Sequence, residues 1–157
     1  RRELFSSLVS SFKKDEKQEK ILRPPYHKNE SIFFTNCKDC EGLCATVCEE
    51  NIIFIQEDFT PKLDLSFSGC TYCNECAIAC PNEVLQVEHK KNINAKIEID
   101  ILNCLSWNKT MCFSCKDPCL DNAIDFLAMF RPSINSNCTA CGFCIKSCPT
   151  NAIKIIS

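Results

Sequence analysis

Short apolar runs alternate with polar, cysteine-rich segments along most of the chain. Each run has the length of a strand and ends at a turn-forming or cysteine-containing segment, which favours short β-strands over long helices. The runs are IIFIQ (52–56), LDLSF (63–67), VLQV (84–87), KIEIDIL (96–102), AIDFLAMF (123–130) and AIKII (152–156). AIDFLAMF also fits a turn of helix, because its length and composition do not separate the two structures.

The cysteines between these runs form four groups. They are Cys37, Cys40, Cys44 and Cys48 (group one); Cys70, Cys73, Cys76 and Cys80 (group two); Cys104, Cys112, Cys115 and Cys119 (group three); and Cys138, Cys141, Cys144 and Cys148 (group four). The β-prone segments SIFFTN and EIDILN precede groups one and three. We expect a short helix between the third and fourth cysteine of each group, so the repeating order is strand, cysteine loop, short helix, strand.

Groups two and four are near-copies, CTYCNECAIACPNEVLQV against CTACGFCIKSCPTNAIKI. A less regular group precedes each of them, at nearly the same distance. The body of the chain is therefore predicted to be a tandem duplication. We place the first module at residues 31–91 and the second at residues 92–157, with an N-terminal segment of residues 1–30 ahead of them.

The N-terminal segment has a different pattern. Its apolar residues fall on one face at helical spacing, which predicts an amphipathic helix. These residues are Leu4, Phe5, Leu8, Val9 and Phe12. The pair Arg1-Arg2 could open an export signal, but four serines interrupt the apolar stretch that such a signal needs. A charged linker and Pro24-Pro25 follow, and no run of 18 apolar residues suggests a membrane span.

Sixteen cysteines in 157 residues imply disulfides or metal. Disulfides are disfavoured, because neighbouring cysteines share tight loops and nothing indicates an oxidising compartment. Zinc sites usually take paired C-x2-C knuckles separated by a longer loop. The C-x2-C-x2-C-x3-C-P run, present at Cys70 and again at Cys138, is instead typical of bacterial iron–sulfur proteins. Two copies favour [4Fe–4S] clusters over both alternatives.

The other two groups depart from this run. Group one is C-x2-C-x3-C-x3-C, with Gly42 in the longer gap, and group three is C-x7-C-x2-C-x3-C. Cys104 follows a β-prone segment and an Asn, as Cys37 does, which favours its role as first ligand. The alternative is a buried thiol that binds no metal. We expect Trp107, in the insertion, to cover the cluster from water.

In two-cluster ferredoxins the fourth cysteine of each run serves the other cluster. Applied to each half, this rule predicts four clusters. We define site 1 as Cys37, Cys40, Cys44 and Cys80; site 2 as Cys70, Cys73, Cys76 and Cys48; site 3 as Cys104, Cys112, Cys115 and Cys148; and site 4 as Cys138, Cys141, Cys144 and Cys119. The expected fold is α+β, built from tandem bacterial two-cluster ferredoxin-like modules.

Charge points to a protein partner. The formal net charge is −2, and thiolate ligation at four clusters would bring it to about −10. An acidic protein suits a basic patch on another protein better than it suits nucleic acid. The sequence holds no phosphate-binding glycine loop and no nucleophile with an adjacent base, and His89 is expected at the surface. We therefore expect a protein that is not an enzyme.

These features resemble the NapF family of ferredoxin-type proteins, accessory proteins of periplasmic nitrate reductase systems. The resemblance rests on the Arg1-Arg2 pair, the RPP at 23–25, the order of the four groups and, above all, the spacing of group three. RPSINSNCTACGFCIKSCPTNAI also fits, although many ferredoxins share it. Group one departs from the family pattern by one extra residue.

The resemblance implies a cytoplasmic iron–sulfur protein that binds the molybdenum-containing catalytic subunit of periplasmic nitrate reductase and assists its maturation before export. A redox donor protein is a second expected partner. Two alternatives stay open: an electron-transfer ferredoxin or relay subunit of an oxidoreductase complex, and an interaction module whose clusters only hold the fold.

The number of clusters can be measured directly. Protein purified without oxygen should contain about sixteen iron atoms and about sixteen acid-labile sulfides per chain, because each cubane holds four of each. About twelve would instead remove one irregular group from the ligand set. Protein without metal should be largely unfolded, since metal binding supplies folding free energy.

Overall fold

The computed structural model describes residues 21–156, which form three separate two-stranded antiparallel sheets and four short helices. The first half contains α1 (Ser31–Asn36), α2 (Leu43–Thr46), β1 (Ile53–Ile55), β2 (Pro61–Leu63), α3 (Glu75–Ile78) and the 3-10 turn η2 (Val87–His89). The second half contains β3 (Lys96–Ile99), β4 (Ile124–Leu127), β5 (Phe130–Ile134), α4 (Phe143–Ser147) and β6 (Ile153–Ile156). The N-terminal helix predicted within residues 1–20 lies outside the described residues.

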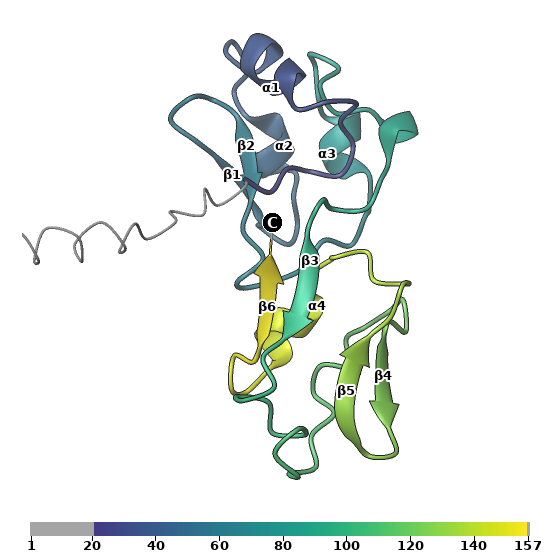
Figure 1. The fold of residues 1–157 in the computed structure, drawn as a ribbon. Helices are drawn as coiled ribbons and strands as arrows, with labels where there is room; N and C mark the ends of the chain where they lie inside the picture. The colour runs from purple at the N-terminus through teal and green to yellow at the C-terminus, as the bar shows by residue number, and fades with distance from the viewer. Residues whose placement is uncertain (1–20, 157) are drawn as a thin grey trace, which may run out of the picture.

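Figure 1 shows how the two halves are arranged. The elements of the first half lie at one end, the β4–β5 hairpin lies at the other end, and β3 and β6 lie between them. Strand β3 pairs with β6 from Lys96 opposite Ile156 to Ile99 opposite Ile153, so the first and last strands of the second half are neighbours. The observed architecture is a ferredoxin-like α+β fold.

Several strand predictions hold. Strands β1, β3 and β6 fall within IIFIQ, KIEIDIL and AIKII. AIDFLAMF forms a strand rather than a helix: it contains β4, a turn at Ala128 in the left-handed region (φ 55°) and the start of β5. Helices α2, α3 and α4 each begin one residue before the third cysteine of groups one, two and four and end before the fourth. The described residues of group three form only turns there.

Three strand predictions are wrong. SIFFTN forms helix α1, because the Asn29 side chain accepts the Ile32 N–H at 3.2 Å and Phe33 turns into the core. The LDLSF strand is displaced to Pro61–Leu63, since the Asp64 carboxylate accepts the Ser66 N–H and starts a turn. VLQV buries Val84 and Leu85 but leads into η2 instead of joining a sheet.

Residues 21–27 pack against the first half. Leu22 accepts the Leu63 N–H at 2.8 Å, and Tyr26 accepts the Gln86 N–H at 2.8 Å. The buried Arg23 guanidinium donates to Thr60 at 2.7 Å and to the Pro61 carbonyl at 2.6 Å. These hydrogen bonds satisfy polar groups that burial would otherwise leave unpaired.

Phe33 lies at the centre of this packing. Its ring is fully buried, 5.1 Å from the Arg23 guanidinium and 5.0 Å from the His27 ring. His27 is itself buried, which lowers its pKa, and its Nδ1 lies 2.7 Å from the Pro24 carbonyl oxygen. The neutral imidazole can therefore donate to that carbonyl, and His27 takes part in packing.

Alanine substitutions of the two adjacent phenylalanines of α1 test this packing. Phe33→Ala should lower the free energy of unfolding of the loaded protein by about 3 kcal/mol or more, because it leaves a cavity in the core. Phe34→Ala should cost less than about 1 kcal/mol, because Phe34 is 50% exposed. Both changes remove a phenyl ring from the same helix, so helix propensity cancels. Equal shifts in the urea midpoint, measured without oxygen, would contradict this arrangement.

Candidate metal centres

The cysteines of the second half surround two cavities, and each cavity draws ligands from two groups. Cys104, Cys112 and Cys115 line one cavity together with Cys148 of group four. The second is lined by Cys138, Cys141 and Cys144 together with Cys119 of group three. Sites 3 and 4 therefore have the membership that the crossed assignment requires. Cys104 lies with its group and is not isolated from it.

The first half repeats the arrangement. Cys70, Cys73 and Cys76 line a cavity with Cys48 of group one. Around site 1, Cys37 and Cys44 each have Cys40 and Cys80 as electrostatic neighbours. The structure thus brings together the four thiols of every predicted site. Their ligation of metal stays a prediction.

The chain reverses direction in the same way after each fourth cysteine. Three residues later comes a residue in the left-handed region, and its N–H donates to the carbonyl of that cysteine. These residues are Asn51 (φ 52°), Glu83 (φ 53°), Asn122 (φ 48°) and Asn151 (φ 52°). Asparagine tolerates this conformation better than most residues. This turn was not predicted, although an asparagine stands at the same place in three of the four groups and indicates it.

The reversal directs backbone N–H groups at sulfur. Ala123 donates to Cys119 Sγ and Ala152 donates to Cys148 Sγ, both at 3.2 Å, and Leu85 donates to Cys80 Sγ at 3.5 Å. All three acceptors are the cysteines that cross to the neighbouring site. Hydrogen bonds to the ligand sulfurs tune the reduction potential of an iron–sulfur centre.

The third cysteine of each group is buried and its thiol is hard to ionise. Burial, together with nearby cysteines, raises the pKa of Cys44, Cys76 and Cys144 to about 12, and burial raises that of Cys115 to about 11. Without metal these thiols stay protonated at neutral pH. Metal loading must therefore release protons and supply the positive charge that stabilises the thiolates.

Cys148 differs from the buried thiols. Burial raises its pKa, but hydrogen bonds from Thr150 and from the backbone N–H of Ala152 outweigh that effect, so the pKa is lowered overall. The same N–H group that could tune a bound cluster therefore also favours the thiolate that binds it.

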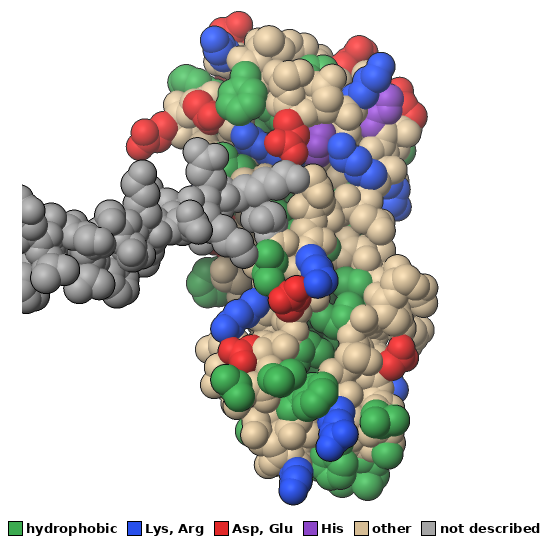
Figure 2. Space-filling model, viewed as in Figure 1, with side chains coloured by type: hydrophobic (Ala, Val, Ile, Leu, Met, Phe, Trp, Pro, Cys, Tyr) green, Lys and Arg blue, Asp and Glu red, His purple; other side chains and the backbone are tan. Residues whose placement is uncertain are grey.

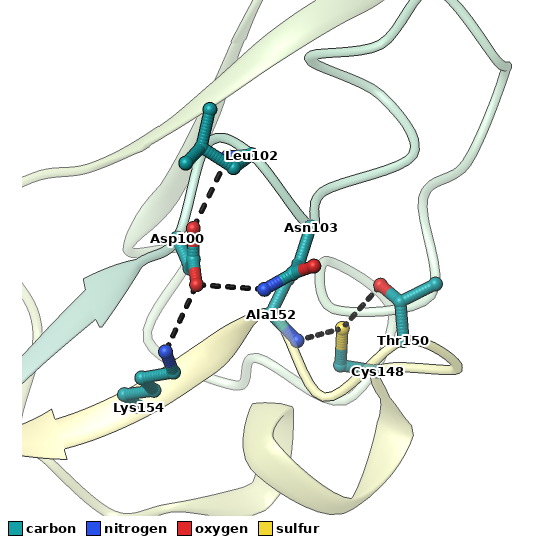
Figure 3. A network of polar contacts seen from close by, with 7 residues as sticks. All are labelled: Asp100, Leu102, Asn103, Cys148, Thr150, Ala152 and Lys154. Carbon is teal, nitrogen blue, oxygen red and sulfur yellow. Dashed lines mark hydrogen bonds and ion pairs between the residues drawn. The ribbon is translucent and has the colours of Figure 1, made fainter.

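An acidic residue, Asp100, organises the turn before Cys104, and Figure 3 shows it with its partners Leu102, Asn103 and Lys154. Asp100 accepts hydrogen bonds from the Leu102 N–H at 3.1 Å and the Asn103 side chain at 2.8 Å, and it pairs with Lys154 at 2.9 Å. These bonds from Lys154 and Asn103 lower the pKa of Asp100 to about 2. The Cys104 N–H donates to the Asp100 carbonyl at 3.0 Å. The turn before Cys104 is thereby fastened to β6, which follows Cys148.

The insertion between Cys104 and Cys112 folds back on this turn. Asn108 donates to the Cys104 carbonyl from its backbone at 3.1 Å and from its side chain at 2.9 Å. Leu105 and Ser106, rather than Trp107, line the cavity of site 3. Trp107 instead donates to the Pro132 carbonyl at 3.1 Å. The longer gap is thus absorbed by a loop that leaves both of its cysteines at the site.

The donor set fits an iron–sulfur cluster. Four thiols around one cavity match the ligation of [4Fe–4S] centres by four cysteine thiolates. In residues 21–156, no three His, Cys, Asp or Glu side chains converge on a position suited to a single metal ion. The ligands of a zinc site, by contrast, lie about 2.3 Å from one atom. The sulfurs here surround a space rather than a point.

Comparisons with known proteins agree with this chemistry. Residues 36–84 match a family model described as a 4Fe-4S dicluster domain, and residues 133–154 match one described as a 4Fe-4S binding domain. Neither match includes group three, whose spacing is irregular. Multiple [4Fe–4S] clusters are therefore the cofactors of this chain.

Two ferredoxin-type proteins named NapF match most of the chain. The chain is 33% identical to NapF of Escherichia coli (strain K12) over 137 residues, which is 84% of this chain and 82% of that protein. It is 34% identical to NapF of Haemophilus influenzae over 155 residues, covering 95% and 87%. The ferredoxin-type protein NapG of Escherichia coli (strain K12) is 29% identical over 162 residues, covering 86% and 70%.

Iron counts in paired variants test whether the fourth cysteine of each group serves the neighbouring site. Cys40→Ala should remove site 1 and lower iron to about twelve per chain. Adding Cys80→Ala should cost no further iron, because Cys80 belongs to the site already lost. Adding Cys48→Ala instead should lower iron to about eight, because Cys48 serves site 2. The opposite result, with Cys80→Ala costing a second cluster and Cys48→Ala costing none, would place each fourth cysteine with its own group.

Proposed function

Because the chain belongs to the NapF family of ferredoxin-type proteins, we propose that it is a cytoplasmic protein that binds the molybdenum-containing catalytic subunit of periplasmic nitrate reductase and assists the maturation of that subunit before export. The observation that supports the iron–sulfur part of this proposal is the gathering of thiols from neighbouring cysteine groups around common cavities. All sixteen cysteines are assigned as ligands, four at each site. A [4Fe–4S] cluster bound there supplies one-electron chemistry.

The residues around these sites give a bound cluster an environment suited to electron transfer. The buried third cysteines keep one side of each site away from water, and the N–H groups of Leu85, Ala123 and Ala152 face crossing sulfurs. Such fixed dipoles stabilise the more negative, reduced state without having to reorient. The assigned role is therefore binding and redox action rather than enzymatic catalysis, and no residue is assigned as catalytic.

We also propose that residues 31–91 and 92–157 are tandem two-cluster modules. The repeated reversal after all four groups supports this division. So does the left-handed conformation shared by the matching pairs Tyr72 and Ala140, and Asn74 and Gly142, in groups two and four. Residues 21–27 pack on the first module.

The surface supports a protein partner over nucleic acid. On the face drawn in Figure 2, Lys and Arg side chains are interspersed with Asp and Glu, and apolar side chains lie among them. Nucleic acid is usually met by a basic stripe or patch. None of the helices within residues 21–156 has the length and apolar character that a membrane crossing requires.

A second candidate is an electron-transfer ferredoxin or relay subunit of an oxidoreductase complex. The backbone N–H of Cys70 donates to the Cys141 carbonyl at 2.7 Å, so the loops of sites 2 and 4 are in contact. This contact favours the second candidate, because closely spaced sites suit electron relay. Clusters that survive repeated reduction and exchange electrons quickly with a donor would support this candidate. Labile clusters together with tight binding to the unexported catalytic subunit would support the maturation role.

Substitutions of the N-terminal apolar residues test whether the chain binds the catalytic subunit through them. In the full loaded chain, Phe5→Ala with Leu8→Ala should weaken recovery of the unexported catalytic subunit about tenfold, since losing a large apolar anchor costs roughly 1.4 kcal/mol or more. Ser6→Ala with Ser7→Ala is the matched control and should leave recovery unchanged. Unchanged recovery in both variants would remove the N-terminal segment from the interface. A wild-type chain that recovers no catalytic subunit would contradict the partner itself.

A further inference from the structure

The two halves meet at the loops of sites 2 and 4. The backbone N–H of Cys70 donates to the carbonyl of Cys141 at 2.7 Å. The Tyr72 hydroxyl donates to the Thr139 carbonyl at 2.7 Å and accepts the Ile93 N–H at 3.1 Å. The cysteine loops of the two near-copies are therefore joined directly, from the first cysteine of group two to the second cysteine of group four.

Glycines allow this close approach. The chain has only three glycines, and two of them lie at the contact. A Cβ atom on Gly69 would lie 2.6 Å from both the backbone nitrogen and Cγ of Phe143. One on Gly142, where φ is +93°, would lie 2.9 Å from Leu65 Cβ. Larger residues at these two positions would push the halves apart.

Thiols from both sites face the same space. Cys70 and Cys141 line one cavity together with Tyr72, Thr139 and Phe143. A predicted ligand of site 4, Cys141, thus lies beside a predicted ligand of site 2, Cys70.

Within each half the two sites are also neighbours. Helix α2, which carries Cys44 of site 1, packs against helix α3, which carries Cys76 of site 2. In the second half, Cys119 of group three lines the cavity of site 4, and Cys148 of group four lines that of site 3. Among the described residues, no hydrogen bond joins group one to group three. The contacts therefore connect sites 1 and 2, sites 2 and 4, and sites 4 and 3.

We propose that the four sites form a single relay in the order 1–2–4–3, with electrons crossing between the halves at the contact of Cys70 with Cys141. This inference rests on the proposed loading of all four sites. With clusters held by these thiols, the contact would let one electron pass from a reduced cluster at site 2 to an oxidised cluster at site 4. Sites 1 and 3 are the ends of the relay, so external donors and acceptors meet the protein there.

Two matched double variants test the order. Cys40→Ala with Cys112→Ala leaves only sites 2 and 4, whereas Cys73→Ala with Cys138→Ala leaves only sites 1 and 3. Each variant keeps one site per half and should bind about eight iron atoms. After reduction with dithionite, the electron paramagnetic resonance spectrum of the first variant should be broadened by spin–spin interaction. That of the second should be the sum of two independent signals. Broadening confined to the second variant, or equal in both, would overturn the order.

Two glycine substitutions test the same order in protein that keeps all four sites. Gly69→Leu should keep about sixteen iron atoms but change the spectrum of the fully reduced protein, because the side chain separates the halves. Gly42→Leu is the control, since a Cβ there would meet Ile55 at 2.7 Å within the first half, and it should leave the interaction between halves intact. A Gly69→Leu spectrum identical to wild type would overturn the proposal. Low iron in both double variants would count against site loading rather than against the order, and the glycine pair would then decide.

Discussion

The exchange of one cysteine between neighbouring groups is the constraint on which the rest of the structure depends. Each site is completed by a thiol from the other group of the same half, so neither site of a half can form before both loops are in place. The constraint couples the folding of the two cysteine loops in each half. It also explains how such short elements hold together, since three two-stranded sheets and four short helices offer little core of their own.

The turn after each fourth cysteine makes the exchange possible. A residue with positive φ reverses the direction of the chain, so the strand or segment that follows runs back across the half. The same reversal places a backbone N–H group within hydrogen-bonding distance of the crossing sulfur. One local conformation thereby sets the fold and the electrostatics of the site together. In the second half, Asp100 and Lys154 add a tie between the turn before Cys104 and strand β6. This tie holds the longest gap in register.

The sequence predicted the chemistry better than it predicted the path of the chain. Cysteine spacing indicated the four groups and their crossed partners, and the structure brings those side chains together. Helix α1 was missed because SIFFTN is apolar enough for a strand, and the Asn29 hydrogen bond together with the burial of Phe33 beside Arg23 and His27 favours a helix. The contact at Gly69 was also missed, because close approach between segments distant in sequence leaves no local pattern. Strand β2 moved for a local reason, the turn held by Asp64.

Anomalous diffraction at the iron edge, from crystals of protein purified without oxygen, tests the central claim most directly. The account predicts four separate iron clusters per chain, each bound by three cysteines of one group and the fourth cysteine of its neighbour. Clusters bound by all four cysteines of a single group, or isolated metal atoms in place of clusters, would contradict it.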